Sequence, residues 1–213
     1  MKVFITGGTG LVGSHLTQQL TGQGYQVTLL TRSIKPGRSL PEGAAYLEAD
    51  PTRPGPWQGE VASHEIVINL AGASIFHRWT EEYKRSLLDS RLLTTRNVVE
   101  ALSPRKGQET VLLNASAVGY YGFHQDEELV EETPSGDDFL ATLARDWEHE
   151  AVKAVDFGVR VIRCRFGIVL GDKGGALDQM VPLFKKGLGS PLGSGRQWFS
   201  WIHQQDLSAV LLF

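Results

Sequence analysis

The chain has 213 residues, of which 41% are hydrophobic, and its formal net charge is −3 at pH 7. This length suits one α/β domain, or one domain with part of a second, and the apolar content is sufficient for a buried core. Lysines and arginines are scattered without a basic run, which argues against a nucleic-acid partner, and no apolar stretch reaches the length of a membrane span.

The first thirteen residues predict a strand, a tight turn and the start of a helix. An apolar run ends at Thr6, and the segment GGTGLVG follows. Glycines let backbone N–H groups approach a phosphate, and the helix behind them adds the positive end of its dipole. The spacing fits G-x-G-x-x-G from Gly8 and G-x-x-G-x-x-G from Gly7, so we predict a dinucleotide site; the alternative is a plain turn. The residues expected at this site are Gly7, Gly8, Thr9, Gly10, Leu11, Val12 and Gly13.

The end of the second predicted strand indicates which dinucleotide binds. A carboxylate there would bind both ribose hydroxyls of NAD, whereas an arginine would meet the 2′-phosphate of NADP. The strand ends at Thr31 and is followed by Arg32, with Lys35 and Arg38 nearby and no carboxylate before Glu42. We therefore predict NADP as the cofactor; the alternative is a solvated surface arginine.

The remaining elements predict a Rossmann-like, doubly wound and mainly parallel sheet of the α/β class. Strands after the first are expected at residues 26–31, 44–49, 65–70, 110–114 and 160–166. Helices are expected from the glycine turn to Gly22 or Gly24, after an N-cap at Thr80 as far as Leu102, and over 139–157. The proline-rich connection at 51–59 is too broken for a full crossover helix. We assign residues 1–170 to an NADP-binding domain and 171–213 to the start of a small, glycine-rich, substrate-facing lobe that is truncated by the end of the chain.

Two further places are candidates for cofactor contact. Leu70, Ala71 and Gly72 follow the fourth strand, where small residues allow a cofactor to lie against the backbone or simply make a tight turn. Arg91 falls on the expected buried face of the long helix. A guanidinium there needs an anion or several carbonyls, so it reaches either a cofactor phosphate or a structural carboxylate.

Candidate chemistry follows the fifth strand. Ser116, Tyr120 and Tyr121 lie in the segment ASAVGYYG, where a hydroxyl and two phenols would sit near the reactive end of a cofactor. The six histidines fall in no metal-ligand spacing, so we predict no metal. Cys164 is the one cysteine, and Met1 leads into a strand instead of a signal peptide, so we expect a cytoplasmic protein.

Five segments together resemble one family. TGGTGLVG, NLAG, SAVGYYG, RFGIVLG and GSGRQWFSWIHQQD occur in the order typical of extended short-chain dehydrogenase/reductases of the NAD-dependent epimerase/dehydratase type. More narrowly, the chain resembles the atypical branch of epimerase family proteins of unknown function. The resemblance implies an NADP site and adds Arg165, in RFGIVLG, as a cofactor residue. It also implies a catalytic serine or threonine with a Tyr-x-x-x-Lys pair on the next helix.

The chain departs from the family pattern at that pair. The tyrosine and lysine positions hold Leu140 and Ala144, and neither side chain can carry a proton. The serine position is Ser116 if Tyr120 is the family tyrosine of the strand end, or an alanine if Tyr121 is; we favour Ser116 because a hydroxyl is chemically useful there.

Two functions are compatible with these residues. One is an NADP-dependent oxidoreductase or epimerase acting on a small carbonyl or hydroxyl compound, with Tyr120 or Tyr121 as a substitute acid activated by Arg91 or Arg165. The other is a non-catalytic NADP(H)-binding sensor or interaction protein. The partner expected in either case is a small molecule, not a membrane or nucleic acid, and an oligomer is possible.

Overall fold

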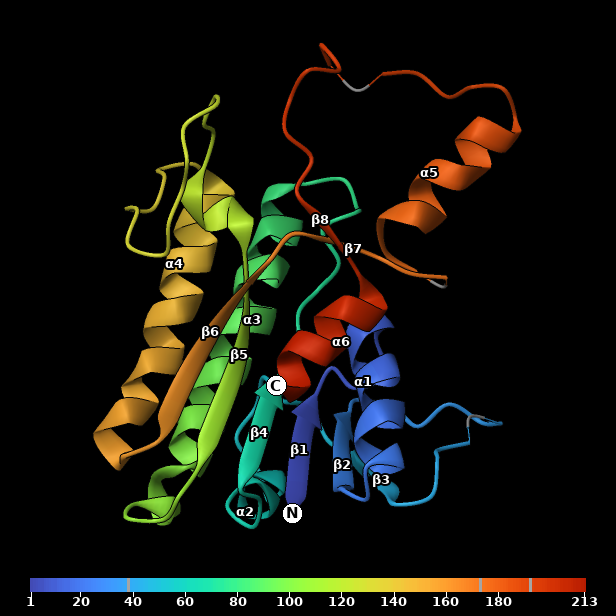
Figure 1. Ribbon diagram of the computed structural model, residues 1–213. Helices are drawn as coiled ribbons and strands as arrows, with labels where there is room; N and C mark the ends of the chain where they lie inside the picture. The colour runs from blue at the N-terminus through green and yellow to red at the C-terminus, as the bar shows by residue number, and fades with distance from the viewer. Residues whose placement is uncertain (38, 173, 192) are drawn as a thin grey trace.

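A computed structural model describes residues 1–37, 39–172, 174–191 and 193–213. Arg38, expected near the cofactor, lies outside the described residues. Six parallel strands form one sheet in the order β3-β2-β1-β4-β5-β6 (Figure 1). The strands are β1 (Lys2–Thr6), β2 (Gln26–Thr31), β3 (Ala44–Glu48), β4 (Ile66–Asn69), β5 (Val111–Ala117) and β6 (Arg160–Phe166). The doubly wound parallel sheet predicted from the sequence is confirmed.

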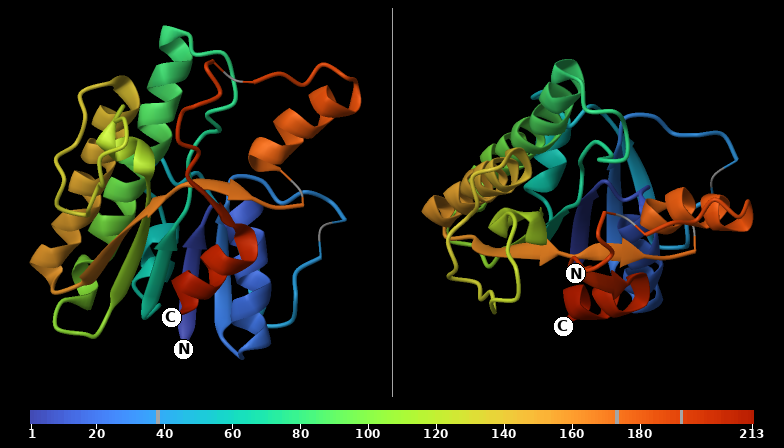
Figure 2. Two further views of the ribbon diagram at one scale, coloured as in Figure 1. Left: turned by 45° about the horizontal axis from the view of Figure 1, so that its top comes forward. Right: turned by 90° about the horizontal axis from the view of Figure 1, so that it is seen from above.

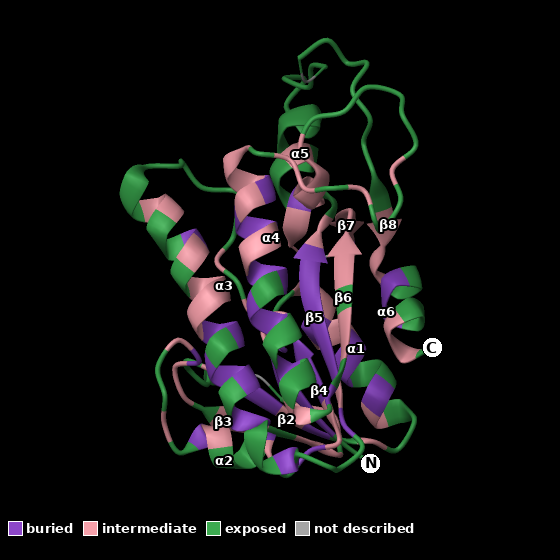
Figure 3. Ribbon diagram, turned by 90° about the vertical axis from the view of Figure 1, so that its left-hand side faces the viewer, coloured by how far each residue is buried: buried purple, intermediate pink, exposed green. Residues whose placement is uncertain are grey.

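Helices cover both faces of the sheet. They are α1 (Leu11–Gly22), α2 (Trp57–Val61), α3 (Glu81–Ala101), α4 (Phe139–Val152), α5 (Gly175–Lys185) and α6 (Gln204–Leu212). Seen from above, α3 and α4 lie on one side of the sheet and α1 and α6 on the other (Figure 2). The alternation of β1 explains this arrangement, because Phe4 packs on the α2–α3–α4 side while Val3 and Ile5 pack on the α1 side. Figure 3 shows the burial concentrated in the central strands and on the helix surfaces that face them.

Polar side chains fix where the two long helices begin. Thr80 caps α3 by accepting a hydrogen bond from the Tyr83 N–H at 3.1 Å, as its sequence position predicted. Asp138 caps α4 by accepting from the N–H groups of Leu140 and Ala141 at 2.8 and 3.1 Å. The helix predicted over 139–157 is α-helical only to Val152 and continues as a 3₁₀ turn before Gly158, whose φ is +78°.

The residues after the sixth strand contain more regular structure than their glycines suggested. β7 (Ile168–Leu170) pairs in parallel with β8 (Trp201–His203), and α5 lies between them in the chain. The helix α6 packs back on α1, where the Nδ1 of His15 lies 2.9 Å from the Oγ of Ser208. The division at residue 170 stays a prediction.

Among the described residues, no helix is both long and apolar enough to cross a membrane.

Candidate dinucleotide-binding site

The glycine turn between β1 and α1 is packed too tightly for any other residue at several positions. Gly7 has φ +69°, and a Cβ there would lie 2.7 Å from the carbonyl carbon of Leu70. A Cβ on Gly13 would lie 2.5 Å from the carbonyl oxygen of Gly7. The Gly10 N–H donates to that same oxygen at 3.0 Å. The turn is therefore a fixed backbone loop at the start of α1, which is the geometry that binds phosphate.

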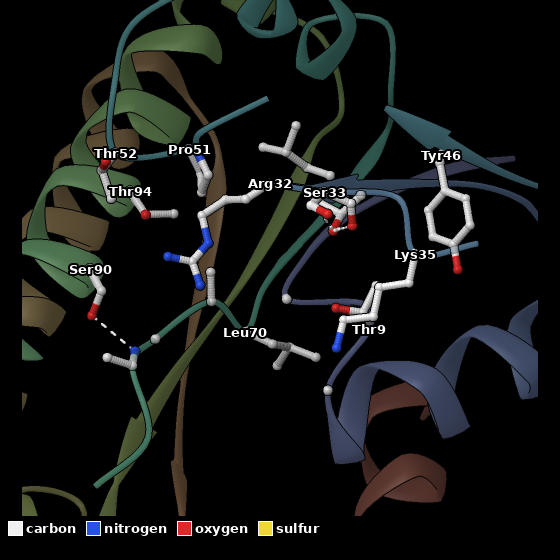
Figure 4. A pocket seen from close by; sticks show the side chains of 17 residues that line it. Thr9, Arg32, Ser33, Lys35, Tyr46, Pro51, Thr52, Leu70, Ser90 and Thr94 are labelled. Carbon is white, nitrogen blue, oxygen red and sulfur yellow. Dashed lines mark hydrogen bonds between the residues drawn. The ribbon is translucent and has the colours of Figure 1, made fainter. Parts of the chain in front are cut away.

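A first cavity of about 670 Å³ opens over this turn at the carboxyl ends of the strands (Figure 4). We call it the nucleotide cavity. Its described lining contains two cations, Arg32 and Lys35, and no carboxylate. Among the described residues, neither cation forms an ion pair. The lining residues are Gly7, Thr9, Gly10, Leu30, Thr31, Arg32, Ser33, Lys35, Tyr46, Pro51, Thr52, Leu70, Ala71, Gly72, Ala73, Ser90 and Thr94.

A second cavity of about 460 Å³ adjoins the first, and we call it the distal cavity. The two cavities share Gly7, Gly10, Leu70, Gly72 and Ala73, so they are parts of one cleft. The distal cavity is lined mainly by apolar side chains, and they include Leu140 and Ala144. The positions where the family resemblance expects tyrosine and lysine therefore face this cavity with groups that cannot transfer a proton.

Arg91 is the charged side chain in the described lining of the distal cavity. Its Nη1 donates to the Leu87 carbonyl at 3.2 Å, its Nη2 donates to the Ala73 carbonyl at 3.1 Å, and the guanidinium lies 5.2 Å from the Trp147 ring centre. No carboxylate of the described residues pairs with it, and burial lowers the pKa of Arg91. The structure thus disfavours the alternative in which Arg91 pairs with a structural carboxylate. Arg91 remains a cation beside the cleft, with N–H donors that are not used by the two carbonyls.

A buried ion pair lies behind the fifth strand. Glu148, only 2% exposed, accepts from the Nε and Nη2 of Arg165 at 2.8 and 2.9 Å and from the Ser116 hydroxyl at 2.7 Å. Burial alone would raise the pKa of Glu148, but the hydrogen bonds from Arg165 and Ser116 outweigh it and hold that pKa below its usual value. Ser116 lines the distal cavity, but its proton is committed to Glu148, so its free lone pairs make it a hydrogen-bond acceptor there.

The two candidate phenols contact Arg165 on a 3₁₀ turn that follows β5. The Tyr121 hydroxyl accepts from Arg165 Nη1 at 2.9 Å, and the guanidinium stacks 3.6 Å from the centre of the Tyr120 ring. Neither tyrosine belongs to the described lining of either cavity. Arg165 therefore supplies the nearby cation that a tyrosine acting as a substitute acid would need. The Tyr121 hydroxyl, however, is turned toward the Arg165–Glu148 ion pair and not into the cleft.

Most residues proposed for cofactor contact do line the cleft. Thr9, Thr31, Arg32, Leu70, Ala71 and Gly72 line the nucleotide cavity, and Leu11, Val12, Gly13 and Arg91 line the distal one, with Gly7 and Gly10 in both. Gly8 is in neither lining, and a Cβ there would meet the side chain of Leu29 on β2, while Arg165 is held in its ion pair. Sequence reasoning missed Glu148. The one local sign of its role is its position on the apolar face of α4, where a carboxylate is unexpected.

The strand order, the glycine turn and the cleft at the carboxyl ends of the strands define a Rossmann-type dinucleotide-binding protein. Residues 3–213 match the profile of the NAD dependent epimerase/dehydratase family, and the chain belongs to this family. The resemblance seen in the sequence is confirmed.

Relatives support the same assignment. The chain is 42% identical over 215 residues to the chloroplastic SDR39U1 homolog of Arabidopsis thaliana, an epimerase family protein, covering 97% of this chain and 60% of that one. It is 38% identical to the epimerase family protein YfhF of Bacillus subtilis, covering 100% of this chain and 69% of the relative. The chain therefore spans only part of the length of these relatives.

Two solved structures are similar over the whole chain. Human epimerase family protein SDR39U1 (isoform 2) with NADPH has a TM-score of 0.81 and 35% identity, and 69% of it is covered. A nucleoside-diphosphate sugar epimerase from Corynebacterium glutamicum has a TM-score of 0.80 and 36% identity, with 43% covered.

Proposed function

We propose that this chain binds NADP(H), with the adenosine half in the nucleotide cavity and the nicotinamide half in the distal cavity. The observation that carries the proposal is the pair Arg32 and Lys35, which line the nucleotide cavity and form no close ion pair among the described residues, Asp50 acting on Arg32 only at longer range. A 2′-phosphate would meet these cations, whereas a 2′-hydroxyl would leave them unneutralised. The NADPH in the human SDR39U1 structure agrees with this assignment.

The test is calorimetric titration of NADPH and NADH into the parent and Arg32→Asp. The variant should lose about 10- to 100-fold in NADPH affinity, which is the size expected for charge-assisted hydrogen bonds, and little in NADH affinity. Arg160→Asp makes the same charge change at the exposed start of β6, away from the cleft, and should bind both cofactors as the parent does. Equal losses for the two cofactors in Arg32→Asp would refute the 2′-phosphate assignment.

Binding is better supported than turnover. Bound NADP(H) would supply hydride exchange at its nicotinamide. Among the described residues that line the distal cavity, none is a proton donor equivalent to the family pair, because Leu140 and Ala144 are apolar and Ser116 donates to Glu148. We therefore place a non-catalytic NADP(H)-binding role ahead of catalysis.

A second candidate function, an NADP-dependent oxidoreductase or epimerase acting on a small compound, is favoured by one observation. Ser116 presents lone pairs to the distal cavity, which suits a substrate hydroxyl better than a carbonyl. Incubation with NADP⁺ and a panel of small alcohols, followed by NADPH absorbance, tests the oxidoreductase, and chiral separation of the same incubations tests the epimerase, which returns its hydride and leaves no net NADPH. Turnover that Ser116→Ala abolishes would support this function, and no turnover with any alcohol would count against it.

A further inference from the structure

Three apolar side chains of the distal cavity stay exposed to solvent. Ile75, Phe76 and Val118 line that cavity and are 41%, 46% and 37% exposed. Ile75 and Phe76 lie in the loop between β4 and α3, and Val118 directly follows β5. The other large apolar residues of the described lining are more buried. These three residues, which we call the apolar rim, therefore mark the solvent-facing side of the cavity.

The loop that carries Ile75 and Phe76 uses polar groups of its own backbone within the protein. The Tyr83 hydroxyl donates to the Ser74 carbonyl at 2.6 Å, and Trp79 Nε1 donates to the Ile75 carbonyl at 2.9 Å. The Phe76 N–H donates to the Ser74 Oγ at 3.2 Å. The rim thus presents carbon to the cavity, and a ligand that covers this apolar surface removes it from water, which is favourable.

The charge in the described lining of the distal cavity lies away from the rim. A Cβ on Gly72 would be 2.9 Å from the central carbon of the Arg91 guanidinium, and Gly72 lines both cavities. Arg91 is therefore on the side that adjoins the nucleotide cavity. Ser116 donates to Glu148 and keeps only its lone pairs for a ligand. A molecule that enters past the rim meets apolar surface and a hydrogen-bond acceptor.

Sugars and apolar alcohols make opposite demands on such a cavity. Each sugar hydroxyl that leaves water needs a hydrogen-bond partner, and burial without one is unfavourable. The described lining side chains with hydrogen-bonding groups are Ser74, Arg91, Ser116 and Trp147. Of these, Trp147 already donates to Thr95 through Nε1, at 2.8 Å. A polyol would leave hydroxyls without partners, whereas an apolar body with one hydroxyl gains from the burial of its carbon.

We infer that the small molecule that shares the distal cavity with the nicotinamide is an apolar alcohol and not a sugar or sugar nucleotide. Its carbon skeleton packs on the apolar rim, and its hydroxyl donates to Ser116. The inference rests on the proposed NADP(H) function and names the class of ligand that the outer part of the cleft receives.

The test uses the chain loaded with NADPH, because an alcohol and the reduced cofactor cannot exchange a hydride and only binding is observed. Calorimetry compares cyclopentanol, cyclohexanol and cycloheptanol, which form a series of increasing CH₂ content. Affinity should rise by about 2- to 4-fold for each added CH₂ as the rim covers it. Myo-inositol, a cyclohexane ring with a hydroxyl on every carbon, and UDP-glucose should bind at least about 10-fold more weakly than cyclohexanol. A flat series, or tighter binding of either polyhydroxy compound, would overturn the inference.

Variants of the rim locate the contact. Phe76→Ala should weaken cyclohexanol binding by about 3- to 10-fold, whereas Phe76→Leu, which keeps an apolar side chain, should stay within about 2-fold of the parent. Val155→Ala truncates an apolar side chain that is 54% exposed, after α4 and outside the described linings, and should bind as the parent does. Equal losses in Phe76→Ala and Val155→Ala would overturn the inference. A matching loss of NADPH affinity in Phe76→Ala would also overturn it, because the rim would then contact the cofactor.

The hydroxyl contact has its own probe. Cyclohexanone has the same ring but cannot donate, so it should bind about 3- to 10-fold more weakly than cyclohexanol, the size of one net hydrogen bond. Equal or tighter binding of the ketone would overturn the contact with Ser116.

The same titrations distinguish the two possible failures. A parent chain that binds NADPH but none of the cyclic alcohols would overturn this inference alone. A parent chain that does not bind NADPH would overturn the proposed function itself.

Discussion

The two halves of the cleft differ in what they offer a ligand. The nucleotide cavity has two cations that form no ion pair with the described residues, a rigid glycine turn and hydroxyl side chains along α3. The distal cavity is mostly apolar, its cation Arg91 rests on backbone carbonyls, and its serine donates to a buried carboxylate. The first half therefore offers charged and backbone groups that suit a nucleotide, whereas the described lining of the second offers mainly apolar surface.

The groups that would bind a cofactor and the positions where the family resemblance expects acid–base chemistry lie on different elements of the fold. Binding depends on backbone geometry at the ends of β1, β2 and β4, and that geometry is complete here. Proton transfer depends on two side chains of α4, and those positions are Leu140 and Ala144. Substitutions in the glycine turn and around the buried ion pair test this contrast.

The largest effect is expected from Gly13→Ala. The added Cβ would lie 2.5 Å from the Gly7 carbonyl oxygen and 2.6 Å from the Gly8 Cα, so the turn must open and its N–H groups move away from the phosphate. NADPH affinity should fall by about 100-fold or more, which corresponds to roughly 2.7 kcal/mol. Gly22→Ala is the matched control on the same helix, because nothing lies within 4 Å of the new Cβ. A Gly13→Ala protein that binds normally would contradict the rigid-turn account.

An intermediate effect is expected from Glu148→Gln. Arg165 would lose its buried anion, and the free energy of unfolding at pH 7 should drop by about 3 kcal/mol. Glu150→Gln on the same helix should cost about 1 kcal/mol or less, since its partners Arg96 and Lys153 are about half exposed. Urea unfolding measures the free energy of unfolding of both variants. Similar losses in the two would contradict a larger contribution from the buried pair at Glu148.

The same variant has a defined pH dependence. The folded pKa of Glu148 lies below its ordinary value of 4.5, so its stabilisation is complete above that pH and is lost as the pH falls through the folded pKa. The stability gap between the parent and Glu148→Gln should therefore narrow as the pH is lowered from 7 toward 3. A gap that stays constant over this range would contradict an ionised, paired Glu148.

The smallest effect is expected from Tyr121→Phe. It removes one acceptor of the Arg165 guanidinium, which keeps its bonds to Glu148 and to the Glu131 carbonyl. Stability should change by less than about 1 kcal/mol, and NADPH affinity should not change, because Tyr121 is outside the described cavity linings. A clear loss of NADPH affinity in calorimetry would mean that the phenol does reach the cofactor.

Local sequence determined much of the fold and of the nucleotide half. The ranges of β2 and β6 match their predictions because each is an uninterrupted strand pattern bounded by turn residues. Arg32 could be predicted as a cofactor residue because the side chain at the end of β2 bears on the choice between NAD and NADP. In contrast, α5 was not predicted, since it begins at two glycines and contains Pro182, which all argue against a helix.

The distal half could not be predicted in the same way. The bond between Ser116 and Glu148 spans 32 positions and exists only because α4 packs against β5. The direction of Tyr120 and Tyr121 depends on a short 3₁₀ turn that no local pattern announces. Pairings of this kind are decided by tertiary packing, and a sequence pattern identifies only the participating residue types.

The most direct test of the central claim, that the nucleotide cavity is an NADP(H) site, is a side-by-side calorimetric titration of the parent chain with NADPH and NADH. Arg32 and Lys35 predict an NADPH affinity higher than that for NADH by about 10-fold or more. Equal affinities, or a preference for NADH, would contradict the account.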